Sequence, residues 1–355
     1  MKYYTVPLLC QKKDNGLYIW RAGGNIKLAV TNKKQRDTTE SENHAASLYR
    51  NCWCSPYDDR GLSAMRCRFI RSSQYVRRIY DHRIKDFLSE GKGNKEQMKL
   101  YTYGDKCNPL IVMLPGSFCP AKTLQYLYSK LQSDFYVCVP EYNGHYAGST
   151  FTTRQNEARE VVQYLLKENL TEINMIYGQS MGAEIGIELM HQLLQKGIHV
   201  GRAFFDGAPC IRFSKPYKVF MNMKFRKLIH MIRDKSADDV LQWKFLNAFT
   251  NGDTESLRPL IECLIDVAPY LTDESIKAET ECCYTFDFPS FGEEDQKKMF
   301  FFYAKEEKAY KICYKGLVQA YPNAVFKVVS GYGHMTYSVR HTEEYVQMLR
   351  EILGS

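Results

Sequence analysis

Ser180 lies between two glycines in a short motif whose residue types are suited to nucleophilic chemistry. Residues 178–182 read GQSMG, follow the apolar run 173–177 and precede an amphipathic stretch that begins at Ala183. This order predicts a strand, a sharp turn and a helix. A turn this tight forces its central residue to positive φ, and the glycines two positions away avoid a collision of side chains. We therefore expect Ser180 to present its hydroxyl as a nucleophile at the top of a sheet.

A histidine and two acids follow later strand-like runs. The aromatic-rich run 299–304 leads directly into Glu306 and Glu307, and the run 325–329 leads into a glycine-flanked loop that contains His334. A histidine can remove the serine proton, and an acid can hold the imidazole tautomer and stabilise its charged form. The chain order is then serine, acid, histidine, which suits nucleophilic acyl transfer.

The apolar run 110–114 predicts a strand that is buried on both faces. It ends in Pro115-Gly116-Ser117, where glycine lets the backbone approach a ligand. The backbone amides of Ser117 and Met181 can then converge on one oxygen and stabilise the negative charge of a tetrahedral intermediate. This pair is the predicted oxyanion hole.

With these residues in place, the chain resembles the α/β-hydrolase superfamily from Met98 to its C-terminus. Residues 140–149 are similar to the family loop D-x-x-G-H-G-x-S, although Glu141 replaces the aspartate and the spacing after His145 is longer. Pro115 stands where the family usually has histidine, which removes no expected donor because the donors are backbone amides. The resemblance implies a mostly parallel, doubly wound sheet with a helical cap inserted after the sixth strand.

The resemblance also implies which acid completes the triad. In the family the acid commonly lies three residues beyond the small residue that ends the strand, which selects Glu307; Asp206 and Glu306 remain alternatives. The implied activity is carboxylesterase-like cleavage of a small, partly apolar ester through an acyl-enzyme. A thioesterase, an amidase or peptidase, or a non-catalytic hydrolase-like binding protein of the same fold stays open.

The sequence predicts a hydrolase core at residues 98–210 and 299–355 and a helical cap at 211–298. Apolar residues recur at helical spacing in three stretches of this insertion and predict helices over an apolar pocket. The three stretches contain Met221, Phe225, Leu228, Ile229 and Ile232; Val240, Trp243, Leu246 and Phe249; and Leu257, Ile261, Leu264 and Ile265. Its basic residues are expected to form a solvated helix face. These are Lys215, Lys218, Lys224, Arg226 and Lys227.

Residues 1–97 carry the net charge of the chain. They contain 19 Lys+Arg and 10 Asp+Glu, against 29 and 30 in the remainder. We expect a basic extension that is disordered or loosely packed, or that precedes a translation start at Met98; residues 30–60 are polar, and residues 62–89 have the composition of a basic helix. Contact with nucleic acid or with an anionic surface is the less favoured alternative.

Composition favours a soluble, cytoplasmic enzyme of 355 residues. No apolar run approaches the roughly 20 residues of a membrane span, so no membrane partner is expected. The N-terminal apolar stretch is too short for a secretory signal, and 12 scattered cysteines suit a reducing compartment. The spacing of Cys52, Cys54 and Cys67 does not fit a zinc site, and neither metal nor cofactor is expected. The residues do not encode an oligomeric state.

Overall fold

The computed structural model describes residues 8–12, 18–22, 26–30 and 98–354. The chain divides into two units, Met1–Glu90 and Gly91–Ser355. In the first unit, β1 (Leu8–Lys12), β2 (Tyr18–Ala22) and β3 (Ile26–Val30) form an antiparallel sheet, which the sequence-based expectation of an unstructured extension did not include. The expected basic helix over 62–89 lies outside the described residues.

The second unit is built on a seven-stranded sheet in the order β10-β9-β8-β7-β5-β6-β4. All neighbouring strands are parallel except β4 and β6, which are antiparallel. The strands are β4 (Lys99–Tyr103), β5 (Leu110–Leu114), β6 (Tyr136–Glu141), β7 (Glu172–Gln179), β8 (His199–Asp206), β9 (Met299–Ala304) and β10 (Val325–Val329). The predicted doubly wound sheet is therefore confirmed.

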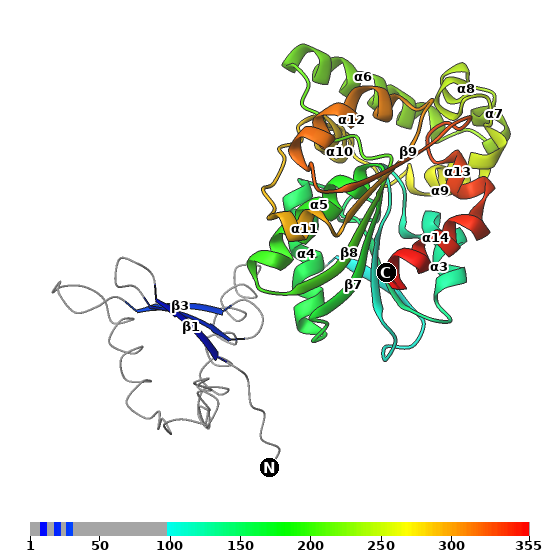
Figure 1. Cartoon of the computed structure of the whole chain (residues 1–355). Helices are drawn as coiled ribbons and strands as arrows, with labels where there is room; N and C mark the ends of the chain where they lie inside the picture. Colours follow the sequence, from blue (N-terminus) through cyan, green and yellow to red (C-terminus); the bar gives the residue numbers. More distant parts are fainter. Residues whose placement is uncertain (1–7, 13–17, 23–25, 31–97, 355) are drawn as a thin grey trace, which may run out of the picture. The chain divides into compact units, whose positions relative to one another are not determined.

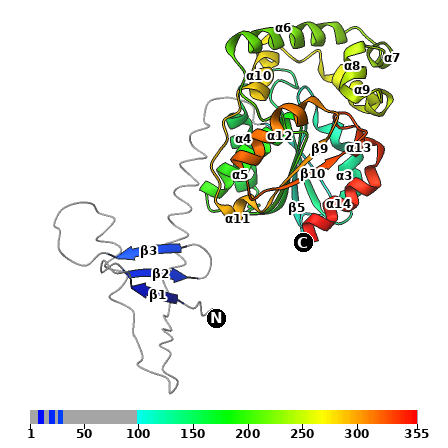
Figure 2. The ribbon, with the colours of Figure 1, turned by 45° about the horizontal axis from the view of Figure 1, so that its top comes forward.

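Helices cover both faces of this sheet, as Figure 2 shows. One face is covered by α3 (Gln125–Leu131) and α14 (Thr342–Gly354), whose buried residues share a core with β5, β6 and β7. The other face is covered by α4 (Arg154–Lys167), α5 (Met181–Gln195) and α12 (Lys308–Ala320). Burial on both faces explains why β5 is apolar at every position.

β5 pairs with β6 on one side and with β7 on the other, so the direction of winding reverses at this strand. In sheets of this kind the crevice at the carboxyl ends of the strands near the reversal is where ligands bind. Ser117 follows β5 and Ser180 follows β7. The topology therefore brings the predicted oxyanion loop and the predicted nucleophile to one edge of the sheet.

Residues 211–298, the helical insertion, connect β8 to β9. Their helices are α6 (Lys215–Ile232), α7 (Ala237–Leu241), α8 (Lys244–Thr250), η3 (Glu255–Leu257), α9 (Arg258–Val267), α10 (Asp273–Tyr284) and α11 (Glu293–Gln296). All three predicted periodic stretches are helical, although the second is divided into α7 and α8 at Trp243. The insertion has its own apolar core, and Phe118 of the oxyanion loop takes part in it. Among the helices of the described residues, none has the length and apolarity that crossing a membrane requires.

Candidate active site

Ser180 occupies a strained turn between β7 and α5. Its backbone has φ 55° and ψ −122°, outside the usual regions for a residue with a side chain. A Cβ added to Gly178 would lie 2.4 Å from the carbonyl oxygen of Gly182, and one added to Gly182 would lie 2.1 Å from that of Leu114. Both glycines are therefore required sterically, as the sequence pattern predicts.

The structure joins His334 to Glu307. His334 Nδ1 shares a hydrogen bond with Glu307 Oε2, while Glu307 Oε1 accepts a hydrogen bond of 2.8 Å from the amide of Ala304. Both side chains are buried. Burial lowers the pKa of His334, but the Glu307 carboxylate and, to a smaller extent, Asp206 together raise it by more, so the net pKa lies above its ordinary value of 6.5. Because Nδ1 is engaged with the acid, Nε2 is the nitrogen left for proton transfer.

The end of β8 connects this pair to Ser180. The amide of Ser180 donates a hydrogen bond of 2.7 Å to the carbonyl of Asp206. A Cβ added to the next residue, Gly207, would lie 2.4 Å from His334 Cε1 and 3.1 Å from Glu307 Oε2. Within the described residues the Ser180 hydroxyl has no hydrogen-bond partner; in ligand-free sites the bond between nucleophile and base is often long and tightens when substrate binds.

The three candidate acids have three different surroundings. Glu306 Oε2 accepts hydrogen bonds from the amides of Gly331 (2.9 Å) and Tyr332 (3.2 Å) and so braces the loop before His334. Asp206 Oδ2 accepts a hydrogen bond of 2.8 Å from the Tyr345 hydroxyl. Burial, with a smaller contribution from the Glu307 charge, raises the pKa of Asp206 to about 7. Of the three, Glu307 is the one that bonds the imidazole.

The two predicted oxyanion amides lie close to the strained turn at Ser180, which is called the nucleophile elbow below. A Cβ added to Gly116 would lie 3.4 Å from Ser180 Cβ, so the loop after β5 passes directly against the nucleophile. The amide of Met181 is the first of α5 and has no preceding helical turn to supply an acceptor. The amide of Ser117 donates no hydrogen bond to any described residue. Both amides are therefore available to a ligand oxygen.

A buried charge network holds the oxyanion loop from the other side. Phe118, at φ 58°, donates its amide hydrogen in a bond of 2.7 Å to Glu279 Oε2 of α10. Glu279 Oε1 lies 2.9 Å from His145 Nε2, and His145 Nδ1 lies 3.5 Å from Glu141 Oε1. Burial lowers the pKa of His145, whereas the Glu279 and Glu141 carboxylates raise it, to about 9 in balance. An imidazolium between two carboxylates thus ties together the oxyanion loop, the loop after β6 and the insertion.

Glu141 and His145 belong to the loop that resembles the family motif, whereas the sequence gives no prediction for Glu279. A glutamate in a helix of the insertion has no local signal that distinguishes it from a solvated residue. The insertion makes two further contacts with the site: Phe249 packs edge-on against the His334 ring, with centroids 4.8 Å apart, and Cys283 Sγ lies 3.2 Å from Ser117 Oγ.

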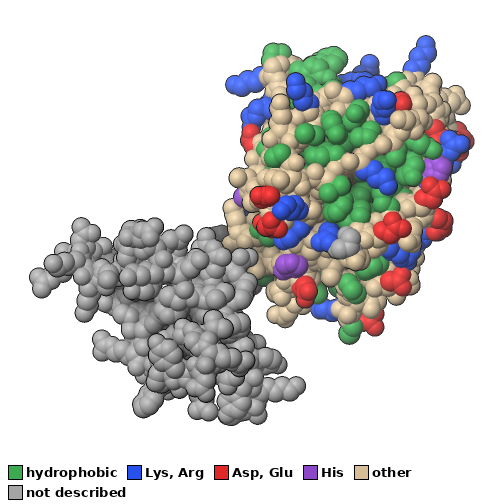
Figure 3. Space-filling view, in the orientation of Figure 1, with side chains coloured by type: hydrophobic (Ala, Val, Ile, Leu, Met, Phe, Trp, Pro, Cys, Tyr) green, Lys and Arg blue, Asp and Glu red, His purple; other side chains and the backbone are tan. Residues whose placement is uncertain are grey.

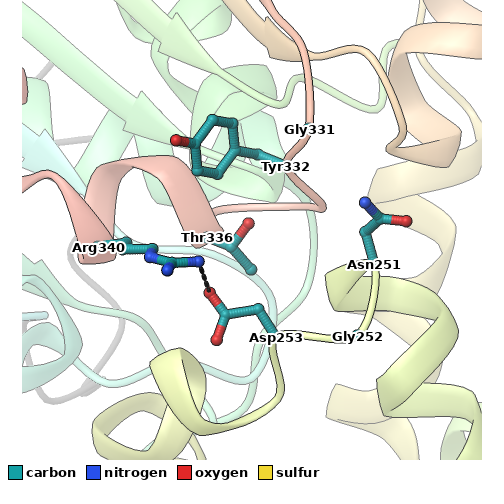
Figure 4. Close-up of a pocket in the computed structure, with 7 residues that line it drawn as sticks. All are labelled: Asn251, Gly252, Asp253, Gly331, Tyr332, Thr336 and Arg340. Atoms are coloured by element: carbon teal, nitrogen blue, oxygen red, sulfur yellow. Dashed lines mark ion pairs between the residues drawn. The ribbon is translucent and has the colours of Figure 1, made fainter.

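A polar cavity of about 420 Å³ opens beside the histidine loop. Figure 4 shows its lining: Asn251, Gly252, Asp253, Gly331, Tyr332, Thr336 and Arg340. Arg340 and Asp253 form an ion pair of 3.7 Å across it. No predicted catalytic side chain lines this cavity. In the part of the chain that the structure describes, no group of His, Cys, Asp or Glu could hold a metal ion, and Cys52, Cys54 and Cys67 lie outside that part.

Comparison with known proteins finds no matching family model and no matching curated protein. Solved structures do match. The chain is similar to a putative α/β hydrolase family protein from Desulfitobacterium hafniense, with 17% identity, a TM-score of 0.57, and coverage of 72% of this chain and 100% of that one. It is also similar to the enol-lactonase from Burkholderia xenovorans LB400 (15% identity, TM-score 0.56, coverage 73% and 96%) and to a thermophilic esterase from Thermogutta terrifontis (13%, 0.55, 72% and 92%). The strand order, the position of the Ser180 turn and the similar solved structures all indicate the same fold. Residues 98–354 have the α/β-hydrolase fold.

Proposed function

We propose that the chain is a serine hydrolase that cleaves a small, partly apolar carboxylic ester through an acyl-enzyme. One observation carries this proposal: the buried bond between His334 and Glu307 lies at the end of β8 that also holds the strained turn of Ser180. A buried His–carboxylate pair beside a strained serine is costly to a fold that makes no use of it. The chain order of Ser180, Glu307 and His334 and the positions of these residues in the fold suit acyl transfer.

The reaction then follows from the positions of the groups. His334 Nε2 takes the proton of Ser180 as Oγ attacks the carbonyl carbon, and the amides of Ser117 and Met181 bind the resulting oxyanion. The intermediate expels the alcohol, which leaves with the proton from His334. Water attacks the acyl-enzyme by the same route and regenerates the serine. Glu307 holds the imidazole through Nδ1 and stabilises its positive charge in both halves.

Two observations favour an ester as the substrate. The neighbours whose names state an activity include esterases and an enol-lactonase, and the insertion beside Ser180 has an apolar core. Thioesterase and amidase or peptidase activity use the same groups. A panel of p-nitrophenyl esters of increasing chain length, with matched thioesters and anilides, separates these activities by kcat/KM.

The triad itself is tested by labelling with a fluorophosphonate probe. We expect the wild type to be labelled, Ser180→Ala to be unlabelled, and Ser129→Ala, a serine change on α3 away from the site, to be labelled as the wild type is. If the wild type resists labelling while its thermal unfolding is cooperative, the chain is a hydrolase-like binding protein. Equal labelling of Ser180→Ala would refute the assignment of the nucleophile.

A further inference from the structure

The outer face of α6 combines exposed apolar side chains with charge of one sign. The helix contains five Lys+Arg and no Asp or Glu. Residues 98–355 hold 29 basic and 30 acidic residues, so the part outside this helix has a net charge of −6. Figure 3 shows hydrophobic and basic side chains together along the upper edge of the unit, where α6 lies in Figure 1.

α6 has apolar side chains on two opposite faces, and the side chains on one of these faces are exposed to solvent. Met221, Ile229 and Ile232 are buried against the rest of the unit. Phe220, Met223 and Met231 are 59%, 66% and 44% exposed. At about 100° per residue these three fall within roughly 80° of the helix circumference, opposite the buried set. Packing of the insertion accounts for the first face and leaves the second unexplained.

Two lysines lie among the exposed apolar residues. Lys224 and Lys227 fall on the same side of the helix as Phe220, and neither forms an ion pair with a described residue. Lys224 Nζ lies 5.9 Å from the centre of the Phe245 ring. Asp273 of α10 pairs with Arg226 (3.4 Å) and with His230 (2.8 Å) of α6. The centre of the face is therefore both apolar and positively charged.

We propose that this face of α6 docks on an anionic lipid surface. A helix whose polar residues are Lys and Arg, and whose other exposed residues are large and apolar, lies in the plane of a bilayer interface, where the lysines meet anionic headgroups and the apolar side chains enter the acyl boundary. A second copy of the chain would bring the same positive charge against itself, and residues 1–97 also carry net positive charge. Nucleic acid would leave Phe220 and Met223 in water.

The sequence predicts a solvated face on this helix and no membrane partner, because charge runs are usually solvated and no segment is long enough to span a bilayer. An interfacial helix needs neither a long apolar run nor a neutral sequence. The signal lies instead in which side of α6 the rest of the unit leaves uncovered, and that appears only in the folded structure.

The full chain is tested by co-sedimentation with vesicles of phosphatidylcholine alone and of phosphatidylcholine with about 30 mol% phosphatidylglycerol. We expect binding to the anionic vesicles, and loss of that binding at about 0.5 M NaCl, where surface charges are screened. Lys224→Gln/Lys227→Gln should lower the partition coefficient about fivefold per lysine, and so about 25-fold together. Phe220→Ser/Met223→Ser should lower it roughly tenfold or more, because the inserted apolar area is lost.

A matched control is available on α12, where Lys311 and Ile312 are also exposed. Lys311→Gln/Ile312→Ser should bind vesicles as the wild type does. All variants change exposed residues, and thermal unfolding followed by circular dichroism checks that each is folded. Phe220→Trp should in addition show a blue shift of tryptophan emission when anionic vesicles are added, since the ring leaves water.

Several results would overturn the proposal. Equal binding to neutral and anionic vesicles, or no binding to either, removes the charge argument. Binding by the α6 variants as strong as that of the wild type would place the attachment in the basic residues 1–97. If duplex DNA binds, and Lys224→Gln/Lys227→Gln weakens it while Phe220→Ser/Met223→Ser does not, the occupant is nucleic acid. None of these readouts depends on catalysis by Ser180.

Discussion

The bond between Glu279 and Phe118 gives a sharp prediction about the oxyanion loop. Both Glu279 oxygens accept hydrogen bonds, one from the Phe118 amide and one from His145. Glu279→Gln keeps the shape of the side chain but leaves only one acceptor oxygen. The NH₂ group of the glutamine then faces a donor, either the Phe118 amide or the protonated His145 ring. His145 can restore a bond only by losing its proton, which removes the charge from the network.

The expected cost has a structural and a catalytic part. A buried donor left unpaired costs about 1–3 kcal/mol, so the free energy of unfolding should fall by that amount. Removing an oxyanion donor outright typically costs on the order of 10² to 10³ in kcat. Glu279 acts on that donor through the neighbouring residue, and we therefore expect kcat to fall about 10- to 100-fold with KM nearly unchanged.

A second readout comes from the pH dependence of stability. The pKa of His145 is about 9 in the folded protein against 6.5 for an unperturbed histidine. A raised pKa means that the proton stabilises the folded state: the contribution is fully present below pH 6.5 and is lost as pH rises through 9. The difference corresponds to about 3 kcal/mol. In Glu279→Gln this loss of stability between pH 6.5 and 9 should shrink, because the carboxylate that raises the pKa is gone.

The assay combines ester kinetics, urea unfolding across this pH range and binding of a boronic acid that mimics the tetrahedral intermediate. If Glu279 positions the loop, affinity for the boronic acid falls by the same factor as kcat. Glu281→Gln, an exposed glutamate on the same helix, is the control and should match the wild type. A variant that loses stability but keeps kcat and boronic acid affinity would show that the network only supports the fold.

Three further predictions concern the triad and the elbow. Glu307→Gln should lower kcat by on the order of 10³- to 10⁴-fold, whereas Asp206→Asn and Glu306→Gln should each cost less than about tenfold; the reverse order in ester kinetics would reassign the acid. The kcat/KM of the wild type should fall at acid pH with a midpoint above 6.5, because His334 must be neutral and its pKa is raised, and Glu307→Gln should move that midpoint to lower pH; an unmoved midpoint would mean that another group titrates. Gly182→Ala should yield little folded protein, because the added methyl group would overlap the backbone of β5; normal yield and melting would contradict the steric reading of the elbow.

The sequence predicts the core elements well because their signals are local. The runs 110–114, 299–304 and 325–329 coincide with β5, β9 and β10, since apolar strands bounded by turn residues leave a continuous pattern. The GQSMG elbow is equally readable, because its glycines answer a steric demand within five residues. β1, β2 and β3 were not predicted, although Asn15-Gly16 and Gly23-Gly24 are typical of hairpin turns.

The sequence does not show which polar groups pair when they are far apart in the chain. Phe118 and Glu279 are 161 positions apart, and nothing near either residue marks the other as its partner. The choice among three acids had the same difficulty, because each follows a strand and only the fold shows which carboxylate reaches the imidazole. The periodicity of apolar residues indicates which side of a helix or strand is buried. It does not indicate which hydrogen-bond partner a buried polar group has on that side.

The insertion therefore does more than cover the edge of the sheet. Phe249 packs against the His334 ring, Cys283 contacts Ser117, and Glu279 holds the amide of Phe118. The first contact comes from α8 and the other two come from α10, so two helices of residues 211–298 contact the candidate active site. α10 also packs against α6, so the helix that bonds the loop after β5 is in contact with the helix that carries the exposed apolar face. Under the proposed mechanism, a substitution in α10 that moves Glu279 or Cys283 should therefore alter kcat as well as KM in ester kinetics.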